Sequence, residues 1–154
     1  MIARLQALLR SAQDPGAPAD PDRIPLAMAA LLIEAARADH AVDEAEIEAV
    51  VVSLSRQLQL TPDEATRLAA RARAAVERSV SLYEFTRPLH ESLTPAQKLE
   101  VVALLWQVAY ADSRIDRYEE YLIGKVAELL YIARGDVIRL RNVAQEEMRA
   151  SRGG

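Results

Sequence analysis

The sequence predicts an all-α domain of seven to eight helices. Hydrophobic residues make up 51% of the 154 residues but aromatic residues only 5%, so the core has to be built mainly from Ala, Leu, Val and Ile. Five Gly and seven Pro are too few for the many tight turns of an all-β fold. A chain of this length is one domain by the usual size of domains, and it can bury roughly two-thirds of its unfolded surface.

The first helix is predicted over residues 2–13. Its apolar stripe has helical spacing and consists of Ile2, Leu5, Leu8 and Leu9. The stretch DPGAPADPDR follows, with three Pro and one Gly in ten residues, and is predicted to be a loop or tether. The stripe has to be buried against this domain, against a second copy in a homodimer, or against a partner protein. We divide the chain into an N-terminal helix and Pro-rich tether (1–24), a helical domain (25–150) and a flexible tail (151–154).

The remaining helices are predicted from start signals and apolar periodicity. Their expected ranges are 24–38, 43–58, 61–78, 81–88, 94–111, 116–131 and 136–148. TPDE, from Thr61, combines a capping Thr, a Pro at the first helical position and a Glu three residues after the cap. SLYE, from Ser81, and TPAQ, from Thr94, repeat this capping pattern. Pro88 is expected to strain or end the helix that SLYE opens.

The same acidic pattern occurs twice, at an offset of 73 residues. ADHAVDEAE runs from Ala38 to Glu46, and ADSRIDRYE runs from Ala111 to Glu119. Eight of the 17 positions from 30 to 46 are identical to their counterparts 73 residues later. Each copy is a nearly all-apolar helix, a tight acidic turn and an amphipathic helix. We therefore expect two related helical hairpins that pack about a pseudo-twofold axis, with Trp106 in the core.

Four of the repeated acids have a ready structural explanation. Asp43 and Asp116 stand where the N-cap of the following helix belongs, and a Glu lies three residues after each, at Glu46 and Glu119. This spacing is close to a capping box, and such a cap stabilises a helix by about 1 kcal/mol.

Asp39 and Asp112 are harder to explain by capping. Each falls at the predicted C-terminal end of a helix, where the helix dipole disfavours an anion. One interpretation is a local turn hydrogen bond to a backbone N–H. The other is a divalent cation, calcium or magnesium, because all the candidate ligands are oxygens. Three carboxylates would bind it only weakly, and the two candidate sets are Asp39, Asp43, Glu46 and Asp112, Asp116, Glu119.

Few residues suggest catalysis. The chain has no Cys, and its two histidines, His40 and His90, lie 50 residues apart. His40 neighbours Asp39 and is either a nitrogen ligand for a transition metal or a solvated turn residue. No Gly-rich phosphate loop occurs. We therefore expect a protein without enzymatic activity; the competing interpretation is a hydrolase or isomerase that uses the acidic-turn carboxylates for acid–base chemistry.

Charge and hydropathy limit the partners. The formal net charge of −4 argues against nucleic acid. The arginines of residues 61–78 are nearly balanced by acids and predict a solvated helix face. The longest near-apolar run, VVALLWQVAYA, is too short to span a bilayer, so no transmembrane segment is expected. We expect a soluble, cytoplasmic protein.

Two segments carry a resemblance to a known family. AALLIEAARADHAVDEAEIEAV and VVALLWQVAYADSRIDRYEEYLIGKVAELL resemble the tellurite-resistance TerB-like family and the N-terminal domain of DjlA-type membrane-anchored co-chaperones. SLYEFTRPLHESLTPAQK between them is similar to the linking segment of a TerB-like subgroup. The resemblance covers about residues 26–140. One departure is that the family usually has Gly after the first Asp, where this chain has His40 and Ser113.

The resemblance implies an all-helical fold and a role in metal binding or in stress-linked assemblies, with no established catalytic activity. We therefore expect a non-enzymatic interaction or sensor module, in a stress-response or envelope-linked assembly, with a protein partner. The chain contains no HPD tripeptide and so carries no J-domain.

Overall fold

The computed structural model describes residues 23–36, 44–111 and 117–153, and all regular secondary structure in these ranges is helical. The seven described helices are α2 (Arg23–Ala36), α3 (Glu44–Leu58), α4 (Pro62–Arg78), α5 (Tyr83–Ser92), α6 (Pro95–Ala111), α7 (Arg117–Leu129) and α8 (Arg134–Gly153). The helix predicted over residues 2–13, the tether and both acidic turns lie outside the described residues.

Helices α2 and α6 form the centre of the core. Every residue from Ala27 to Ile33 in α2 is at most 5% exposed, and every residue from Val101 to Trp106 in α6 is at most 3% exposed. A helix that is apolar all round has to be covered all round. The prediction that Trp106 lies in the core is confirmed.

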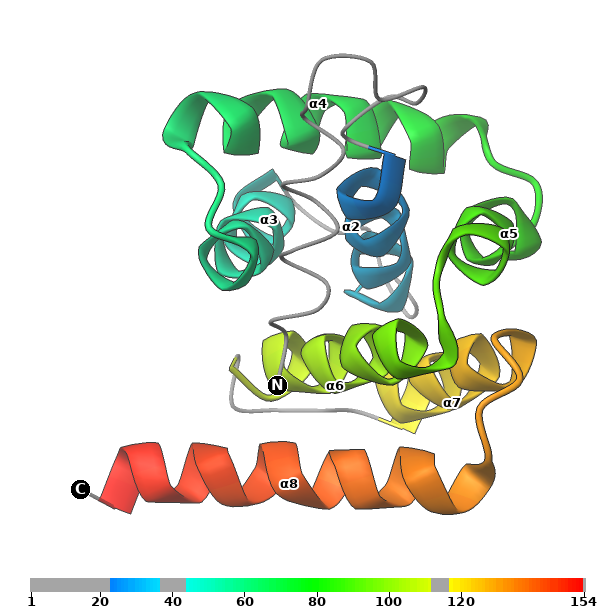
Figure 1. Cartoon of the computed structure of the whole chain (residues 1–154). Coiled ribbons are helices and arrows are strands. Elements are labelled where there is room, and N and C mark those ends of the chain that lie inside the picture. The colour runs from blue at the N-terminus through cyan, green and yellow to red at the C-terminus, as the bar shows by residue number, and fades with distance from the viewer. Residues whose placement is uncertain (1–22, 37–43, 112–116, 154) are drawn as a thin grey trace.

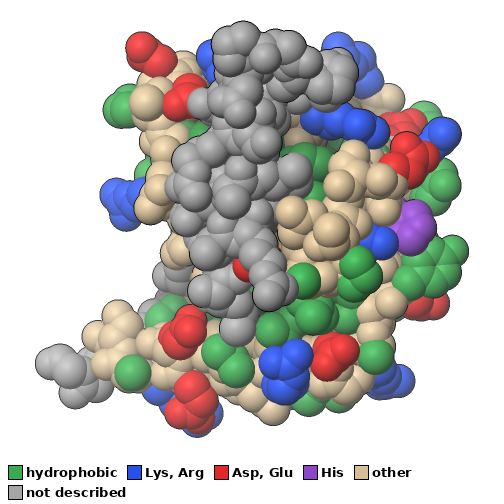
Figure 2. Space-filling model, viewed as in Figure 1, with side chains coloured by type: hydrophobic (Ala, Val, Ile, Leu, Met, Phe, Trp, Pro, Cys, Tyr) green, Lys and Arg blue, Asp and Glu red, His purple; other side chains and the backbone are tan. Residues whose placement is uncertain are grey.

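The other helices cover these two in layers (Figure 1). Helix α4 lies along one edge of the molecule and packs against α2 and α3, while α8 lies along the opposite edge against α6 and α7. Helix α5 packs against α2 and α7. The C-terminal end of α8 extends beyond α6 (Figure 1) and projects from the body of the molecule in the space-filling view (Figure 2).

The contacts between helices follow the internal repeat. Helix α2 packs against α7, and α6 packs against α3, so the first helix of each hairpin contacts the second helix of the other. This pattern is unchanged when the two hairpins are exchanged, as expected for a pseudo-twofold arrangement. The repeat also extends to a third helix that the sequence analysis did not include, because α4 covers α2 as α8 covers α6.

The second helix of each repeat ends in the same way. The Gln59 N–H donates to the Arg56 carbonyl (3.2 Å) and the Leu60 N–H to the Ser55 carbonyl (2.9 Å). After α7 the equivalent bonds run from Tyr131 to Glu128 (3.0 Å) and from Ile132 to Ala127 (2.9 Å). Both ends are Schellman motifs. The left-handed positions, which usually hold Gly, are occupied by Gln59 (φ 60°) and Tyr131 (φ 61°).

Two of the three capping patterns that begin with Ser or Thr are confirmed. The Thr61 hydroxyl accepts from the Glu64 N–H (3.2 Å), and a Glu64 carboxylate oxygen accepts from the Thr61 N–H (3.0 Å). Thr94 and Gln97 form the same reciprocal pair. These two caps set the starting points of α4 and α6.

The capping box predicted for SLYE was wrong. Helix α5 begins one residue later than the pattern requires, with Leu82 at the N-cap and no side-chain cap bond. The Ser81 hydroxyl instead accepts from the Tyr83 N–H (3.0 Å), and Glu84 accepts from the Val80 N–H (3.5 Å). The two side chains therefore bond to backbone groups outside the predicted register.

Of the two effects expected of Pro88, straining or ending its helix, the second does not occur, since α5 continues to Ser92. Proline removes one helical hydrogen bond, which is costly in an isolated helix. Here Phe85, Thr86 and Leu89 are buried against neighbouring helices, and this packing outweighs the local preference. Helix α8 is likewise longer than the predicted 136–148.

None of the described helices is both long enough and apolar enough to cross a membrane.

Replacing Gln59 by Gly is expected to stabilise the fold. Gln59 is exposed and adopts a backbone conformation that costs an L-residue roughly 1 kcal/mol relative to Gly. The Gln59→Gly variant should therefore raise the free energy of unfolding by up to about 1 kcal/mol in urea denaturation. Ala70→Gly, in the exposed middle of α4, is the control and should lower it by about 1 kcal/mol. Equal destabilisation by both substitutions would contradict a left-handed Gln59.

Candidate functional site

The sequence-predicted cation ligands fall largely outside the described residues. Asp39, Asp43, Asp112 and Asp116 are not described, nor are the side chains of Glu46 and Glu119. Helix α3 begins at Glu44 and α7 at Arg117, so each helix begins directly after the second aspartate of its motif. The two acidic turns thus connect equivalent helices in the two repeats, and their binding of a cation stays a prediction.

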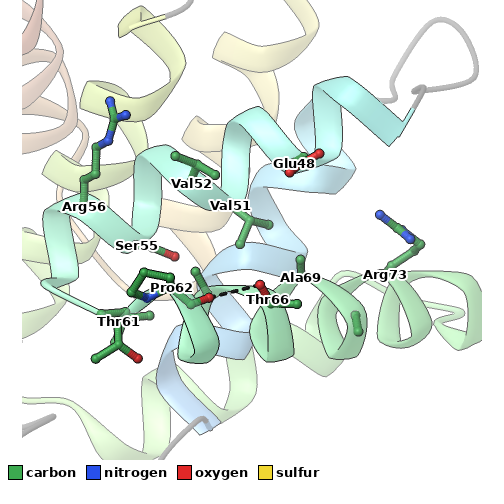
Figure 3. A pocket seen from close by; sticks show the side chains of 13 residues that line it. Glu48, Val51, Val52, Ser55, Arg56, Thr61, Pro62, Thr66, Ala69 and Arg73 are labelled. Carbon is green, nitrogen blue, oxygen red and sulfur yellow. Dashed lines mark hydrogen bonds between the residues drawn. The ribbon is translucent and has the colours of Figure 1, made fainter.

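A groove lies between α3 and α4 (Figure 3). It has a volume of about 540 Å³, within the range of small-molecule and peptide sites. Its lining is formed by Glu48, Val51, Val52, Ser55, Arg56, Leu60, Thr61, Pro62, Ala65, Thr66, Ala69, Ala70 and Arg73. Most of these residues are apolar or small.

The walls of the groove are formed by residues four apart along α3 and along α4. On α3, Val51 and Ser55 point towards α4, whereas Val52 and Arg56 lie along the other edge of the helix (Figure 3). On α4 the rows are Pro62, Thr66, Ala70 and Ala65, Ala69, Arg73. Positions four apart lie on one face of a helix, so these small side chains leave a continuous channel. From Pro62 to Arg73 the wall is about 16 Å long at the helical rise per residue.

Backbone and capping bonds set the corner at one end of the groove. The Schellman motif at Gln59 turns the chain out of α3, and the Thr61–Glu64 capping box starts α4 two residues later. The Thr66 hydroxyl donates to the Pro62 carbonyl (3.0 Å), which satisfies its donor within α4. The angle between the two walls is therefore determined by local bonds and does not require a ligand.

Ser55 carries a buried polar group that lines the groove. The residue is 4% exposed, and its hydroxyl oxygen has no hydrogen-bond partner among the described residues. The hydroxyl lies on the side of α3 that faces α4 (Figure 3). A buried hydroxyl without a hydrogen bond costs about 1–3 kcal/mol. The oxygen is covered in this structure, so a ligand in the groove would recover part of this energy only after a local shift of the neighbouring side chains.

Charged side chains lie at both ends of the groove. Arg56, which is exposed, lies near the corner with α4, and Glu48 and Arg73 lie near the opposite end (Figure 3). The middle is apolar, with Val52 exposed at 38%. An apolar floor between charged ends suits an amphipathic segment better than a small uncharged molecule.

The sequence by itself does not indicate this groove, because the nearly balanced charges of α4 predict a solvated face. Arg67 and Arg78 are exposed as expected, but Arg71 and Arg73 are half-buried. The available signal was the pair of small-residue rows at a spacing of four on α4. These rows indicate a groove only once α3 is known to lie beside α4.

His90 lies in the last turn of α5, within a second polar cluster. Its Nδ1 is 2.8 Å from the Lys98 Nζ, and its ring centroid is 4.9 Å from that of Tyr131. Lys98 donates this bond, so Nδ1 acts as acceptor. The cluster connects α5, α6 and the turn before α8 on an exposed surface, and it contains no Ser or Cys nucleophile.

The family model of the tellurite resistance protein TerB matches residues 25–142. This span is most of the chain and includes both acidic motifs and both walls of the groove. No curated protein and no solved structure matches the chain. The chain therefore belongs to the TerB family.

Replacing Ser55 by Ala is expected to stabilise the apo protein. The substitution removes a buried, unpartnered hydroxyl and also improves helix propensity, so the free energy of unfolding should rise by about 1 kcal/mol or more. Ser53→Ala, two residues earlier on α3 and half-buried, is the matched control and should give only the propensity gain of about 0.5 kcal/mol. A loss of stability in Ser55→Ala would show that the hydroxyl has a partner in solution.

Proposed function

We propose that this TerB-family chain is a non-enzymatic interaction module, which binds a segment of a partner protein in the groove between α3 and α4. The observation that supports this function best is the buried Ser55 hydroxyl, which has no hydrogen-bond partner and lies in a groove with an apolar middle and charged ends. Buried polar groups in folded proteins are almost always hydrogen-bonded. A binding partner supplies the missing bond.

The family description names tellurite resistance. On that basis we extend to this chain a role in a cytoplasmic stress-response or envelope-linked assembly. Binding is preferred to catalysis because the groove supplies a surface for a chain segment, whereas its polar side chains do not pair a nucleophile with a base.

We further propose that the acidic turns make the module a cation sensor. Helix α3 begins directly after the first turn and also forms one wall of the groove, with Glu48 in its second turn. A calcium or magnesium ion bound near Asp39, Asp43 and Glu46 would therefore act on a helix that contacts the partner. The second turn is expected to bind more weakly, because Arg114 and Arg117 lie within its motif.

Photo-crosslinking from the groove tests the interaction. A benzophenone amino acid at Ala70, exposed in the groove, should give a discrete adduct with one protein when the chain is produced in a bacterium. The same probe at Glu77, exposed on α4 but outside the groove, is the control and should not give this adduct. Val52→Asp places a charge on the groove surface and should reduce the yield from Ala70 at least fivefold. Equal adducts from both positions would exclude the groove as the binding surface.

Titration of the apo protein with calcium, magnesium and zinc tests the sensor. Backbone amide signals of residues 39–46 should shift with calcium or magnesium at millimolar concentration, and those of residues 112–119 should shift less. Zinc should have the smallest effect because the ligands are oxygens. The apo protein should remain folded, since the helix caps do not need the ion. If no amide in either segment shifts, the acids act only as caps.

A further inference from the structure

The helix predicted over residues 2–13 has an apolar face that needs cover. That face consists of Ile2, Leu5, Leu8 and Leu9. The segment contains no acidic residue, and its two basic residues, Arg4 and Arg10, flank the apolar face. A helix of about 12 residues is marginal in water by itself. It is therefore stable only where its apolar face packs against another surface.

The groove between α3 and α4 has the complementary shape. Its α4 wall contains three alanines, Ala65, Ala69 and Ala70, and its middle is apolar. Small side chains on one helix let the larger side chains of another pack closely against it. The α4 wall is about 16 Å long, and a helix over residues 2–13 would be about 18 Å long. The segment therefore matches the groove in length and in apolar character.

The chain between this segment and α2 is long enough to reach the groove. Helix α2 packs against α4, and the Arg23 guanidinium in its first turn pairs with Glu91 of α5 (3.8 Å). The start of α2 lies beside the C-terminal half of α4 (Figure 1). Residues 14–22 include three prolines, and an extended course at about 3.1 Å per residue gives them a reach of about 28 Å. A helix with its side chains is only about 10–12 Å wide, so this tether can cross α4 and enter the groove.

Charge favours one direction of the segment in the groove. A tether that comes from the C-terminal half of α4 arrives at the end where Glu48 and Arg73 lie (Figure 3). Arg10 is the basic residue nearer the tether, and Glu48 is an exposed carboxylate on the α3 wall. Arg73 lies on the opposite wall, so the preference is modest, as for other exposed ion pairs. Arg10 is thereby placed beside Glu48.

We propose that residues 2–13 of the same chain occupy the groove as a helix, with their apolar face over the alanines of α4, and that a partner segment has to displace them. The proposal rests on the proposed function of the groove and adds its regulation. A segment on a short tether has an effective concentration in the millimolar range. The apparent affinity for a partner is therefore reduced to the fraction of chains in which the groove is free.

Photo-crosslinking in the purified chain tests the contact. A benzophenone amino acid at Ala70 should join to a peptide of the N-terminal segment, as read by mass spectrometry after proteolysis. Leu5→Asp/Leu9→Asp places two charges on the apolar face and should lower this yield by about tenfold or more. Ala3→Asp/Ala7→Asp adds the same charges at the same spacing on the opposite face, so this matched control should retain the yield.

Isotope labelling shows which chain supplies the segment. In an equal mixture of ¹⁵N-labelled and unlabelled chain, the two peptides joined through Ala70 should carry the same isotope. Mixed pairs would show that a second copy supplies the segment, and they would overturn the proposal.

Release of the segment should open the groove to the partner. When the chain is produced in the bacterium, Leu5→Asp/Leu9→Asp should raise the yield of the partner adduct from Ala70 by about threefold or more, whereas Ala3→Asp/Ala7→Asp should leave it unchanged. If the partner adduct forms but does not rise, or if Ala70 does not crosslink to the N-terminal segment, the inference is overturned and the groove keeps its proposed function. If the segment crosslinks but no variant gives a partner adduct, the proposed function is refuted and only the contact within the chain is retained.

Discussion

The burial of α2 and α6 is the constraint on which the rest of the fold depends. Both helices are apolar around almost their whole circumference, so neither can lie on a surface. One hairpin cannot cover its own first helix. Each first helix therefore takes contacts from the other hairpin and from a third helix, α4 over α2 and α8 over α6. Each hairpin alone leaves its first helix partly uncovered, and the two hairpins together cover both. This explains why the chain holds two copies of the pattern.

The C-terminal ends of α3 and α7 determine the direction in which α4 and α8 leave them. The Schellman motifs after α3 and α7 leave Leu60 and Ile132, the residues after each left-handed position, partly buried against the core. Each third helix is thereby directed back over the first helix of its own repeat. Gln59 and Tyr131 are retained at left-handed positions without the conformational freedom of Gly. Hydrogen bonds and apolar contacts at the two corners offset this strain.

Covering the core leaves a groove between α3 and α4, whose α4 side is formed mostly by small side chains. The groove and its unpartnered Ser55 are thus consequences of how the repeat is closed. In this arrangement the wall formed by α3 also adjoins the first acidic turn, which is how a cation and a partner could be linked through one helix.

The sequence alone determined the helical class, the repeat, the burial of Trp106 and the starts of α4 and α6, because apolar periodicity and capping residues act over a few neighbouring positions. It also indicated the family, through the two acidic motifs. Local rules did not place the cap at SLYE, and Pro88 did not end α5, in which Phe85 and Leu89 are buried on both sides of it. Only the tertiary structure decided that α4 and α8 belong to the repeat and that Ser55 faces a groove. A groove depends on the distance and angle between two helices, and no spacing within either helix contains that information.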